Sequence, residues 1–396
     1  MWKRFVENLR CPLCRGRLML HSFTGSRQTL SAEHIALGKQ LKVFDKDFNA
    51  YVEAGLLLCD RCKSRFPIEN GLPIMFGYTT PAHTDFAKKF ASQIRECAGQ
   101  YDFPSGQPQE GELFTMLSFS EEWRSYSYDG VLWRNTYEDL EATFSLEVDF
   151  TQNRDRHASF LEIGCGLGLT TALAQRFYKG DAVGVDLSFA CMRAAQQFKD
   201  NPFVHFVQAS AFHLPFEERS FGVVYSRGVL HHTYSTRDSF KEVATFCRPT
   251  GLVYVWVYGP GSIHDSPARK AAYLAEVAIR PVLSRSPSSL GTTMFLSFLT
   301  APYRLANWFH RLQNPKIQKY TYRRAMHAAR DRFTPKYAHR HQADEVCNWF
   351  QDAGFEEVTV VNWRSMPVAQ QDTYRRNIGV HGRQKAAVRI LEFAAQ

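Results

Sequence analysis

A glycine-rich turn beside an acidic residue carries the clearest chemical signal in this sequence. Glu162 lies near the end of an apolar run, and Gly164, Gly166 and Gly168 follow at alternate positions. Because glycine has no Cβ atom, such a turn lets the backbone approach a ligand closely. Turns that bind a dinucleotide pyrophosphate instead use the spacing Gly-x-Gly-x-x-Gly. The spacing therefore favours a ligand that has no pyrophosphate, with an acidic residue beside it.

Asp186 is the second acidic residue of this candidate site. It follows the apolar run 182–185 and precedes Leu187 and Ser188. A carboxylate at the tip of a strand accepts hydrogen bonds from both hydroxyl groups of a ribose. The alternative is that Asp186 only caps the helix that follows. Its position within the run Gly-Val-Asp-Leu-Ser favours the ribose role.

Alternating strand and helix patterns place both acidic residues at or near strand ends. The expected strands are 160–163, 182–185, 204–207, 222–225 and 251–258, and the expected helices are 169–177, 189–198 and 238–246. This alternation is typical of a doubly wound sheet. Later segments predict helices over 262–335, a helix over 343–353, and strands over 358–363 and 377–382. We therefore predict an α/β fold with a Rossmann-like, seven-stranded sheet, an antiparallel last strand and a helical insert after the fifth strand.

Two Cys-x-x-Cys pairs predict a metal site in the N-terminal segment. They are Cys11 with Cys14 and Cys59 with Cys62, each at a tight turn flanked by short apolar pieces. Four thiolates in two such knuckles form a closed tetrahedral zinc site, whose role is structural. The alternative is a set of redox-active dithiols. Because the other five cysteines are scattered, the chain suits a reducing compartment, and we expect a zinc ribbon in a cytoplasmic protein.

Four motifs in order resemble class I S-adenosylmethionine (SAM) dependent methyltransferases, in the broad group that includes ubiquinone and menaquinone biosynthesis enzymes. The motifs are the glycine turn with Asp186, the segment 207–216, the strand and loop 220–232, and the turn 248–252. The similarity covers 160–258. Separately, residues 66–74 (Phe-Pro-Ile-Glu-Asn-Gly-Leu-Pro-Ile) resemble the small zinc-ribbon subunit that activates tRNA and translation-factor methyltransferases.

This resemblance implies a SAM-binding enzyme and a role for each matched residue. Asp186 and Leu187 are assigned to the ribose end of the cofactor. Ser210, before Ala211, replaces the aspartate that usually binds the adenine amino group, and Ser226 lies on the strand that approaches the methionine end. The residues assigned to the cofactor site are Glu162, Gly164, Gly166, Gly168, Asp186, Leu187, Ser210, Ala211 and Ser226.

Two adjacent histidines and an aromatic cluster are the remaining candidates near the cofactor. His231 and His232 lie in the loop expected to reach the methyl group, so either is a candidate general base. The alternative is that the pair only shapes the pocket. Trp123, Tyr126 and Tyr128 are candidates to line or close the cofactor pocket, with core packing as the alternative.

The positive charge of the chain is concentrated in one segment. Residues 262–340 carry 14 Lys and Arg against 3 Asp and Glu, so the segment alone has a net charge of 14 − 3 = +11, which exceeds the +9 of the whole chain. The segment also contains the strongly apolar run 293–309. We expect either a helical cap over a bulky apolar acceptor with an anionic group, or a basic amphipathic surface on anionic lipid through 290–324. The third interpretation is a packed subdomain with solvated charges. Near its end, 331–341 is expected to bring His339 or Arg340 to the acceptor.

These patterns divide the chain into five expected segments. They are a zinc ribbon (1–78), a helical linker with an aromatic cofactor lid (79–158), the SAM-binding core (159–261), a basic helical insert that caps the acceptor (262–340), and a C-terminal helix with the last two strands (341–396). No stretch has the length and apolar character of a membrane-spanning helix, and no secretory signal is evident.

Three functions remain open from the sequence. The first is methylation of a small or lipid-like, anionic metabolite by a cytoplasmic enzyme, with peripheral membrane contact as an option. The second is methylation of RNA or protein, and the third is a non-catalytic scaffold. Positions 226–229 read Ser-Arg-Gly-Val, where methyltransferases acting on a base or glutamine amine carry an Asn-Pro-Pro-Tyr-type motif. Nucleic acid is therefore the less favoured partner.

Overall fold

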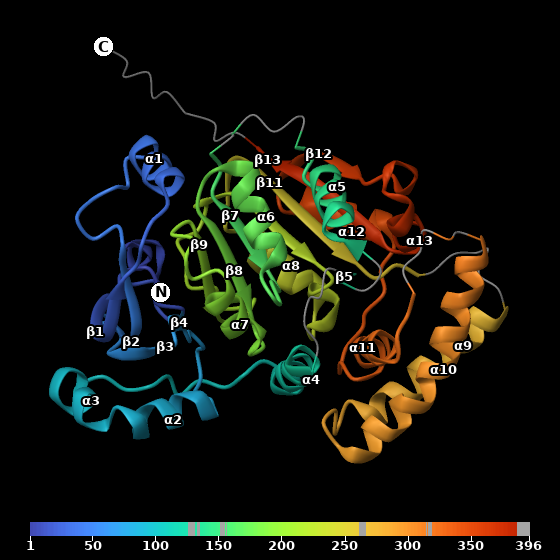
Figure 1. The fold of residues 1–396 in the computed structure, drawn as a ribbon, viewed down its shortest axis with the longest axis horizontal. Helices are drawn as coiled ribbons and strands as arrows, with labels where there is room; N and C mark the ends of the chain where they lie inside the picture. Colours follow the sequence, from blue (N-terminus) through green and yellow to red (C-terminus); the bar gives the residue numbers. More distant parts are fainter. Residues whose placement is uncertain are drawn as a thin grey trace, which may run out of the picture.

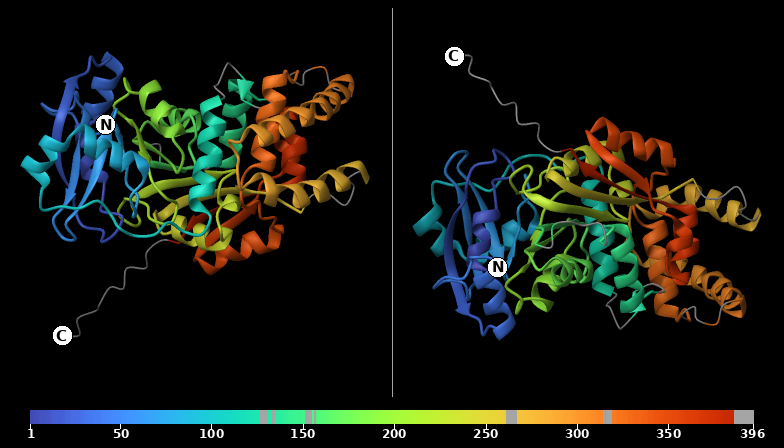
Figure 2. Two further views of the ribbon diagram at one scale, coloured as in Figure 1. Left: turned by 90° about the horizontal axis from the view of Figure 1, so that it is seen from below. Right: turned by 90° about the horizontal axis from the view of Figure 1, so that it is seen from above.

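The computed structural model describes residues 1–125, 131–132, 135–150, 155, 157–260, 267–313, 315 and 319–385. A central sheet runs through the molecule, as Figure 1 shows. An N-terminal β-rich unit lies against one edge of this sheet, and a helical insert projects beyond the opposite side, which Figure 2 shows from two further directions. Tyr126 and Tyr128, two of the predicted lid residues, lie outside the described residues.

The central sheet has seven strands, and its order confirms the predicted fold class. The strands are β7 (Phe160–Ile163), β8 (Ala182–Asp186), β9 (Val204–Gln208), β10 (Phe221–Arg227), β11 (Cys247–Val257), β12 (Phe355–Val360) and β13 (Ile378–Gln384). They are arranged in the order β12-β13-β11-β10-β7-β8-β9. Only β13, the last strand, runs antiparallel to its neighbours β11 and β12. The carboxyl ends of β7, β8 and β10 therefore meet at one edge of the sheet.

Helices cover both faces of the sheet because its strands are apolar on both sides. The helices of the core are α5 (Tyr137–Glu147), α6 (Leu169–Tyr178), α7 (Ala190–Gln197), α8 (Thr236–Ala244), α12 (Ala343–Asp352) and α13 (Val368–Arg376). Phe160 and Leu161, neighbours on β7, belong to two different core clusters. Alternation along the strand thus divides the core into one layer with α5, α6 and α13 and another with α8 and α12.

The N-terminal unit contains several helices and strands in addition to the two cysteine knuckles. It contains a 3-10 helix at Lys3–Asn8, β1 (Met19–Arg27), α1 (Ala32–Gln40), β2 (Ala50–Cys59), β3 (Ser64–Glu69) and β4 (Leu72–Pro73). The strands form an antiparallel sheet in sequence order. The polar stretch between the two cysteine pairs therefore folds as a long hairpin arm with a helix. Because β1 is largely exposed, its hydrophobicity pattern does not indicate a strand.

This unit packs against the β9 edge of the central sheet and forms an isolated bridge to it. The amide of Met75 donates to the carbonyl of Gln208 at 2.8 Å, and the amide of Arg10 donates to the carbonyl of Pro215 at 2.8 Å. Phe5 and Leu9 share one buried core cluster with Val207 and other residues of the sheet. Because an edge strand otherwise exposes unpaired amide and carbonyl groups, the N-terminal unit protects this edge.

The remaining helices connect the N-terminal unit to the sheet and form the insert. The connectors are α2 (Pro81–Lys89), α3 (Ala91–Ala98) and α4 (Glu112–Ser125), with short strands β5 (Val131–Leu132) and β6 (Asn135–Thr136). The insert consists of α9 (Pro267–Leu283), α10 (Leu290–Gln313) and α11 (Tyr322–Phe333). The buried carboxylate of Glu276 on α9 pairs with Arg280, Arg332 and Arg340, which ties α9 to α11 and to the chain after it.

Candidate functional site

The glycine turn after β7 has a backbone conformation that requires glycine. Gly164 has φ 79° and Gly168 has φ 77°, both in the left-handed region that other residues rarely adopt. A Cβ atom on Gly164 would lie 2.0 Å from Val229 Cγ2, and one on Gly168 would lie 2.5 Å from the ring of Phe206. The turn can therefore pass between a strand and the loop after β10 only with glycine at these positions.

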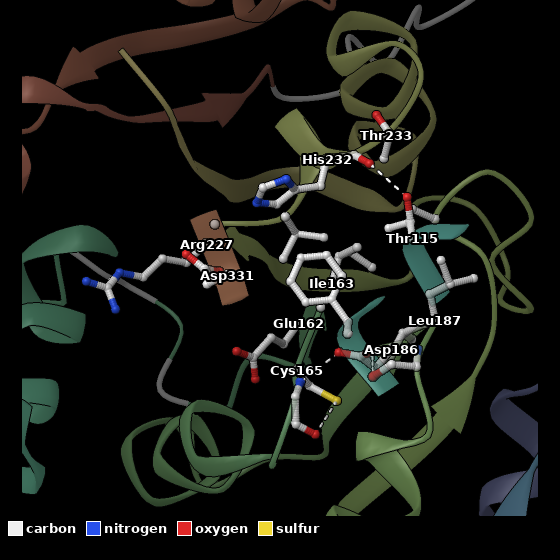
Figure 3. A pocket seen from close by; sticks show the side chains of 18 of the residues that line it. Thr115, Glu162, Ile163, Cys165, Asp186, Leu187, Arg227, His232, Thr233 and Asp331 are labelled. Atoms are coloured by element: carbon white, nitrogen blue, oxygen red, sulfur yellow. Dashed lines mark hydrogen bonds between the residues drawn. The ribbon is translucent and has the colours of Figure 1, made fainter. Parts of the chain in front are cut away.

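A cavity of about 430 Å³ opens at the carboxyl ends of β7, β8 and β10. In doubly wound sheets, ligands bind in the crevice at this edge. Glu162 and Asp186 lie on one side of the cavity and His232 lies on the other, with Asp331 between them (Figure 3). The predicted cofactor residues that line it are Glu162, Gly164, Gly166, Asp186, Leu187, Ser210 and Ala211.

Gly168 and Ser226 are predicted site residues that do not line this cavity. Gly168 lies at the start of α6 and makes room for Phe206 behind the turn. Ser226 is buried, and its hydroxyl donates to the carbonyl of Ile163 at 3.3 Å, which links β10 to β7. Both residues support the wall of the cavity from behind.

Asp186 holds the turn and the start of the next helix together. One carboxylate oxygen accepts from the amide of Gly166 at 2.8 Å, and the other accepts from the amide and hydroxyl of Ser188, each at 2.7 Å. Burial raises the pKa of the Asp186 carboxyl above its ordinary value. The contact with Ser188 corresponds to the capping interpretation, yet the same carboxylate also lines the cavity, and its Oδ2 keeps a lone pair for a ligand.

Glu162 is a buried carboxyl group at the floor of the cavity. Its Oε2 accepts from the hydroxyl of Thr171, the residue at which a dinucleotide-binding turn has its third glycine. Burial raises the pKa of Glu162 to about 8. A cationic group bound beside it would favour the ionised carboxylate and lower this pKa, so the site is suited to an ammonium.

Ser210 and Phe212 form the wall of the cavity that faces the N-terminal unit. The hydroxyl oxygen of Ser210 accepts from the amide of Phe212 at 3.2 Å, and the ring of Phe212 stacks on Tyr234 with centroids 4.9 Å apart. The segment that follows, Leu214 to Phe216, pairs with the first cysteine knuckle: Arg15 donates to the carbonyl of Leu214 and Leu9 forms a bridge with Phe216. The N-terminal unit thus braces this wall.

The structure separates the two candidate histidines. The ring of His232 lines the cavity, its Nδ1 bonds the carbonyl of Tyr337 at 2.6 Å, and burial lowers its pKa to about 4. The imidazole is therefore neutral, with the proton on Nδ1 and a lone pair on Nε2. His231 lies behind the cavity lining and packs on Tyr258 with centroids 3.8 Å apart.

The segment 331–341 contributes differently from the prediction. His339 and Arg340 do not line the cavity; His339 bonds the carbonyl of Thr233 at 3.0 Å, and Arg340 donates to the carbonyl of Gly259 at 3.1 Å. His339 thus holds the loop that carries His232, and Arg340 holds the chain just after β11. Asp331, at the end of α11, lines the cavity instead. Other lining residues that sequence reasoning did not assign include Thr115, Phe119, Arg227, Trp256, Tyr258, Tyr320 and Gln370.

The four predicted zinc ligands converge. All four Sγ atoms lie within 4.8 Å of one another, with Cys11 to Cys62 at 3.5 Å and Cys14 to Cys59 at 3.4 Å. A tetrahedral zinc ion with Zn–S bonds of about 2.3 Å requires sulfur atoms roughly 3.8 Å apart, so this arrangement fits a structural zinc ion. It closes the turn before β1 against the turn between β2 and β3.

Comparisons with known proteins identify two domains. Residues 161–255 match the family model described as a methyltransferase domain, and residues 3–71 match the family described as Trm112p-like protein. The uncharacterized methyltransferase YcgJ of Bacillus subtilis (strain 168) is 35% identical over 94 residues, which are 23% of this chain and 37% of YcgJ. The O-methyltransferase cnsE of Penicillium expansum is 31% identical over 129 residues, or 31% of this chain and 46% of cnsE.

The chain spans less than half the length of either curated relative. Among solved structures, phosphoethanolamine N-methyltransferase 2 of Haemonchus contortus in complex with S-adenosyl-L-methionine has 13% sequence identity and a TM-score of 0.42. The superposition covers 72% of this chain and 61% of that chain.

Proposed function

We propose that this chain, which joins a Trm112p-like domain to a methyltransferase domain, is a SAM-dependent methyltransferase for a small or lipid-like metabolite. The observation that carries the proposal is the cavity at the carboxyl ends of the parallel strands, with two buried carboxyl groups beside a glycine turn. Its volume of about 430 Å³ is that of a small-molecule site.

We assign the cavity residues to the separate parts of SAM. Glu162 is placed to accept from the ammonium of the methionine moiety, and Asp186 to accept from the ribose hydroxyls. Ser210 and Ala211 would contact the adenine, with the ring of Phe212 nearby. When bound, SAM supplies a sulfonium methyl group. The residues of the chain align donor and acceptor, and this alignment lowers the barrier of an in-line displacement.

His232 is the histidine that we assign to the acceptor side. Its Nε2 presents a lone pair, because Nδ1 is committed to the carbonyl of Tyr337. With a pKa of about 4, the ring is a weak base at neutral pH and a good hydrogen-bond acceptor. We therefore assign it to orienting the acceptor, while His231, behind the lining, supports the loop.

The predicted anionic character of the acceptor rests on the charge of the insert. Tyr320 and Asp331 are the residues of 262–340 that line the described cavity, so the Lys and Arg side chains described in that segment lie outside it. Arg227, a cation in the lining, already pairs with Glu147 at 3.0 Å. We therefore propose that an anionic group of the acceptor, or of the lipid around it, meets the insert outside the cavity.

A methyl-transfer experiment tests the acceptor class. Purified protein is incubated with methyl-labelled SAM and a cell extract that has been separated into lipid, small-molecule, RNA and protein fractions. The proposal expects label in the lipid or small-molecule fraction. Label in RNA or protein would support the second candidate function, which the Trm112p-like match to 3–71 favours. Bound SAM without transfer to any fraction would favour a scaffold.

The insert has an apolar stripe that faces solvent. It consists of Leu290, Met294, Phe298, Leu305, Trp308, Phe309 and Leu312 on α10, with Phe298 77% exposed and Trp308 52% exposed. On an ideal helix these positions fall within roughly 100° of arc, opposite the buried Leu296 and Asn307. In soluble proteins such a stripe normally faces the core. No helix in the described parts of the chain is apolar and long enough to cross a bilayer.

We propose that this stripe rests on an anionic lipid surface. The exposed Arg304, Lys319 and Arg323 accompany it, so apolar burial and attraction to lipid phosphates act together. The projecting α9 and α10, at the right of Figure 1, extend away from the N-terminal unit and leave this surface accessible. This geometry would bring a lipid-like acceptor to the side of the molecule that carries the insert.

We expect the protein to co-sediment with phosphatidylglycerol vesicles and to bind phosphatidylcholine vesicles much less. The double variant Phe298→Ser, Trp308→Ser should lose about tenfold in vesicle affinity, since two large apolar side chains no longer enter the interface. Val368→Ser, which alters an exposed apolar residue on α13, is the matched control and should bind normally. Equal binding by both variants would contradict this role. A concentration-dependent dimer that the double variant abolishes would instead assign the stripe to a second copy of the chain.

A further inference from the structure

Asp331 is a partly buried carboxyl group on the cavity wall that the cofactor assignment leaves unused. It lies at the carboxyl-terminal part of α11 and lines the cavity. Figure 3 shows it between His232 and Glu162. The hydroxyl of Tyr258, just after β11, donates to Asp331 Oδ2 at 3.3 Å. Tyr258 also lines the cavity, so the pair forms one polar patch on its wall.

The titratable groups around Asp331 come from four helices and one strand end. They are Glu122 on α4, Arg280 on α9, Tyr303 on α10, His327 on α11 itself and Tyr258 after β11. Glu122 is fully buried and bonded to His327 at 2.7 Å, and burial raises its pKa well above the ordinary value. Burial, followed by the charge of Glu122, raises the pKa of Asp331 to about 7.

We propose that Asp331 is the residue that accepts a proton from the methyl acceptor, and that the acceptor is therefore a nucleophile bearing a proton, such as an amine or a hydroxyl group. The inference rests on the proposed function. Asp331 lines the same cavity as Glu162 and Asp186, and it comes from the insert that is expected to cap the acceptor. Tyr258 positions the carboxylate by its hydrogen bond. His232 would hold the same acceptor from the other side.

The methyl transfer requires no reactant besides SAM and the acceptor. The lone pair of the nucleophile forms a bond to the methyl carbon, the bond between that carbon and sulfur breaks, and its electron pair remains on sulfur as a neutral thioether. The proton of the nucleophile passes to the carboxylate of Asp331, which later releases it to solvent. A base whose pKa lies near the working pH is the most effective acceptor for this proton, which favours Asp331 over His232.

The test uses proton release on cofactor binding and needs no acceptor. SAM and S-adenosylhomocysteine share the ammonium that faces Glu162, but only SAM carries the sulfonium charge. If Asp331 faces the methyl group, the sulfonium favours its ionised form, so SAM should release more protons than S-adenosylhomocysteine. At pH 7, near the pKa of Asp331, we expect the difference to be up to about half a proton per site. Calorimetry in two buffers of different ionisation enthalpy measures it.

Three variants test whether Asp331 causes the difference in proton release between the two ligands. Asp331→Asn should abolish the difference between the two ligands while both still bind. Glu162→Gln should weaken both ligands and preserve the difference. Tyr258→Phe removes a hydrogen bond that favours the carboxylate, so it should raise the pKa of Asp331 and move the difference to higher pH. Tyr258→Phe also serves if Asp331→Asn does not fold.

The outcomes separate this inference from the proposed function. Binding of both ligands with the same proton release, or a difference that persists in Asp331→Asn, would overturn the role of Asp331 and leave the SAM site intact. Absence of binding by either ligand would overturn both. Once an acceptor is identified, the acidic limb of the kcat profile should disappear in Asp331→Asn, and Tyr258→Phe should shift it upward.

Discussion

Replacing Cys59 by Ser, or removing zinc with a chelator, should lower the free energy of unfolding by about 3 kcal/mol or more. Cys59 is buried at the end of β2 and faces Cys14 across the predicted zinc site. Without the ion, its knuckle loses the bonds that close it, and the core that the N-terminal unit shares with the central sheet loosens. Chemical denaturation followed by circular dichroism measures the change.

The same substitution should weaken SAM binding although Cys59 is remote from the cavity. The first knuckle braces Leu214 and Pro215 through Arg15 and Arg10, and these residues follow the Ser210 wall of the cavity. We expect a loss of roughly tenfold in affinity, a coupling energy typical of linked sites. Cys97→Ser, which changes a half-buried cysteine outside the cluster, is the matched control and should shift stability by less than ~1 kcal/mol. Equal effects of the two variants would contradict a structural zinc site.

Gly164→Ala should nearly abolish SAM binding. The added methyl group would meet Val229, which lines the cavity, at 2.0 Å, and the φ of 79° is strained for alanine. The turn must move, and it carries the amide of Gly166 that holds Asp186. We expect a loss of at least about a hundredfold in affinity, together with a stability loss of about 2 to 4 kcal/mol. Titration calorimetry and thermal unfolding measure the two effects.

Gly166→Ala provides the matched control for this prediction. Its Cβ atom would meet Trp123 at 3.4 Å, an ordinary contact, so the substitution adds the backbone strain of its left-handed φ of 51°, about 1 to 2 kcal/mol, without a steric clash. We therefore expect a much smaller effect there. Adding Val229→Ala to Gly164→Ala removes the clash but not the backbone strain, so binding should recover in part. If Gly164→Ala binds SAM normally, the turn is not the element that shapes this site.

The central sheet could be predicted from the sequence because the patterns that indicate it are local. Apolar strands that alternate with helices predict a doubly wound fold, and a glycine turn before Asp186 locates its ligand edge. The four cysteines also come together as their spacing indicates. The arm between the pairs was not predicted, because β1 is largely exposed and shows no regular alternation of buried residues.

The acceptor side required the structure because it depends on contacts between distant segments. His231 and His232 are adjacent in sequence, but they lie on a 3-10 turn that directs only His232 into the cavity. Asp331 and Tyr258 meet across 73 residues, and no pattern in the sequence indicates that α11 folds back over the sheet edge. Within 331–341, the histidine and arginine residues were more conspicuous candidates than the aspartate that lines the cavity.

The measurement that tests the central claim most directly is titration calorimetry with SAM and S-adenosylhomocysteine, comparing the wild-type protein with Asp186→Ala. We expect the wild type to bind both ligands with micromolar affinity. In Asp186→Ala, loss of the ribose contacts and of the carboxylate that holds Gly166 should abolish measurable binding. A folded, zinc-loaded wild type that binds neither ligand, or an Asp186→Ala variant that binds both as the wild type does, would contradict the assignment of this cavity to SAM.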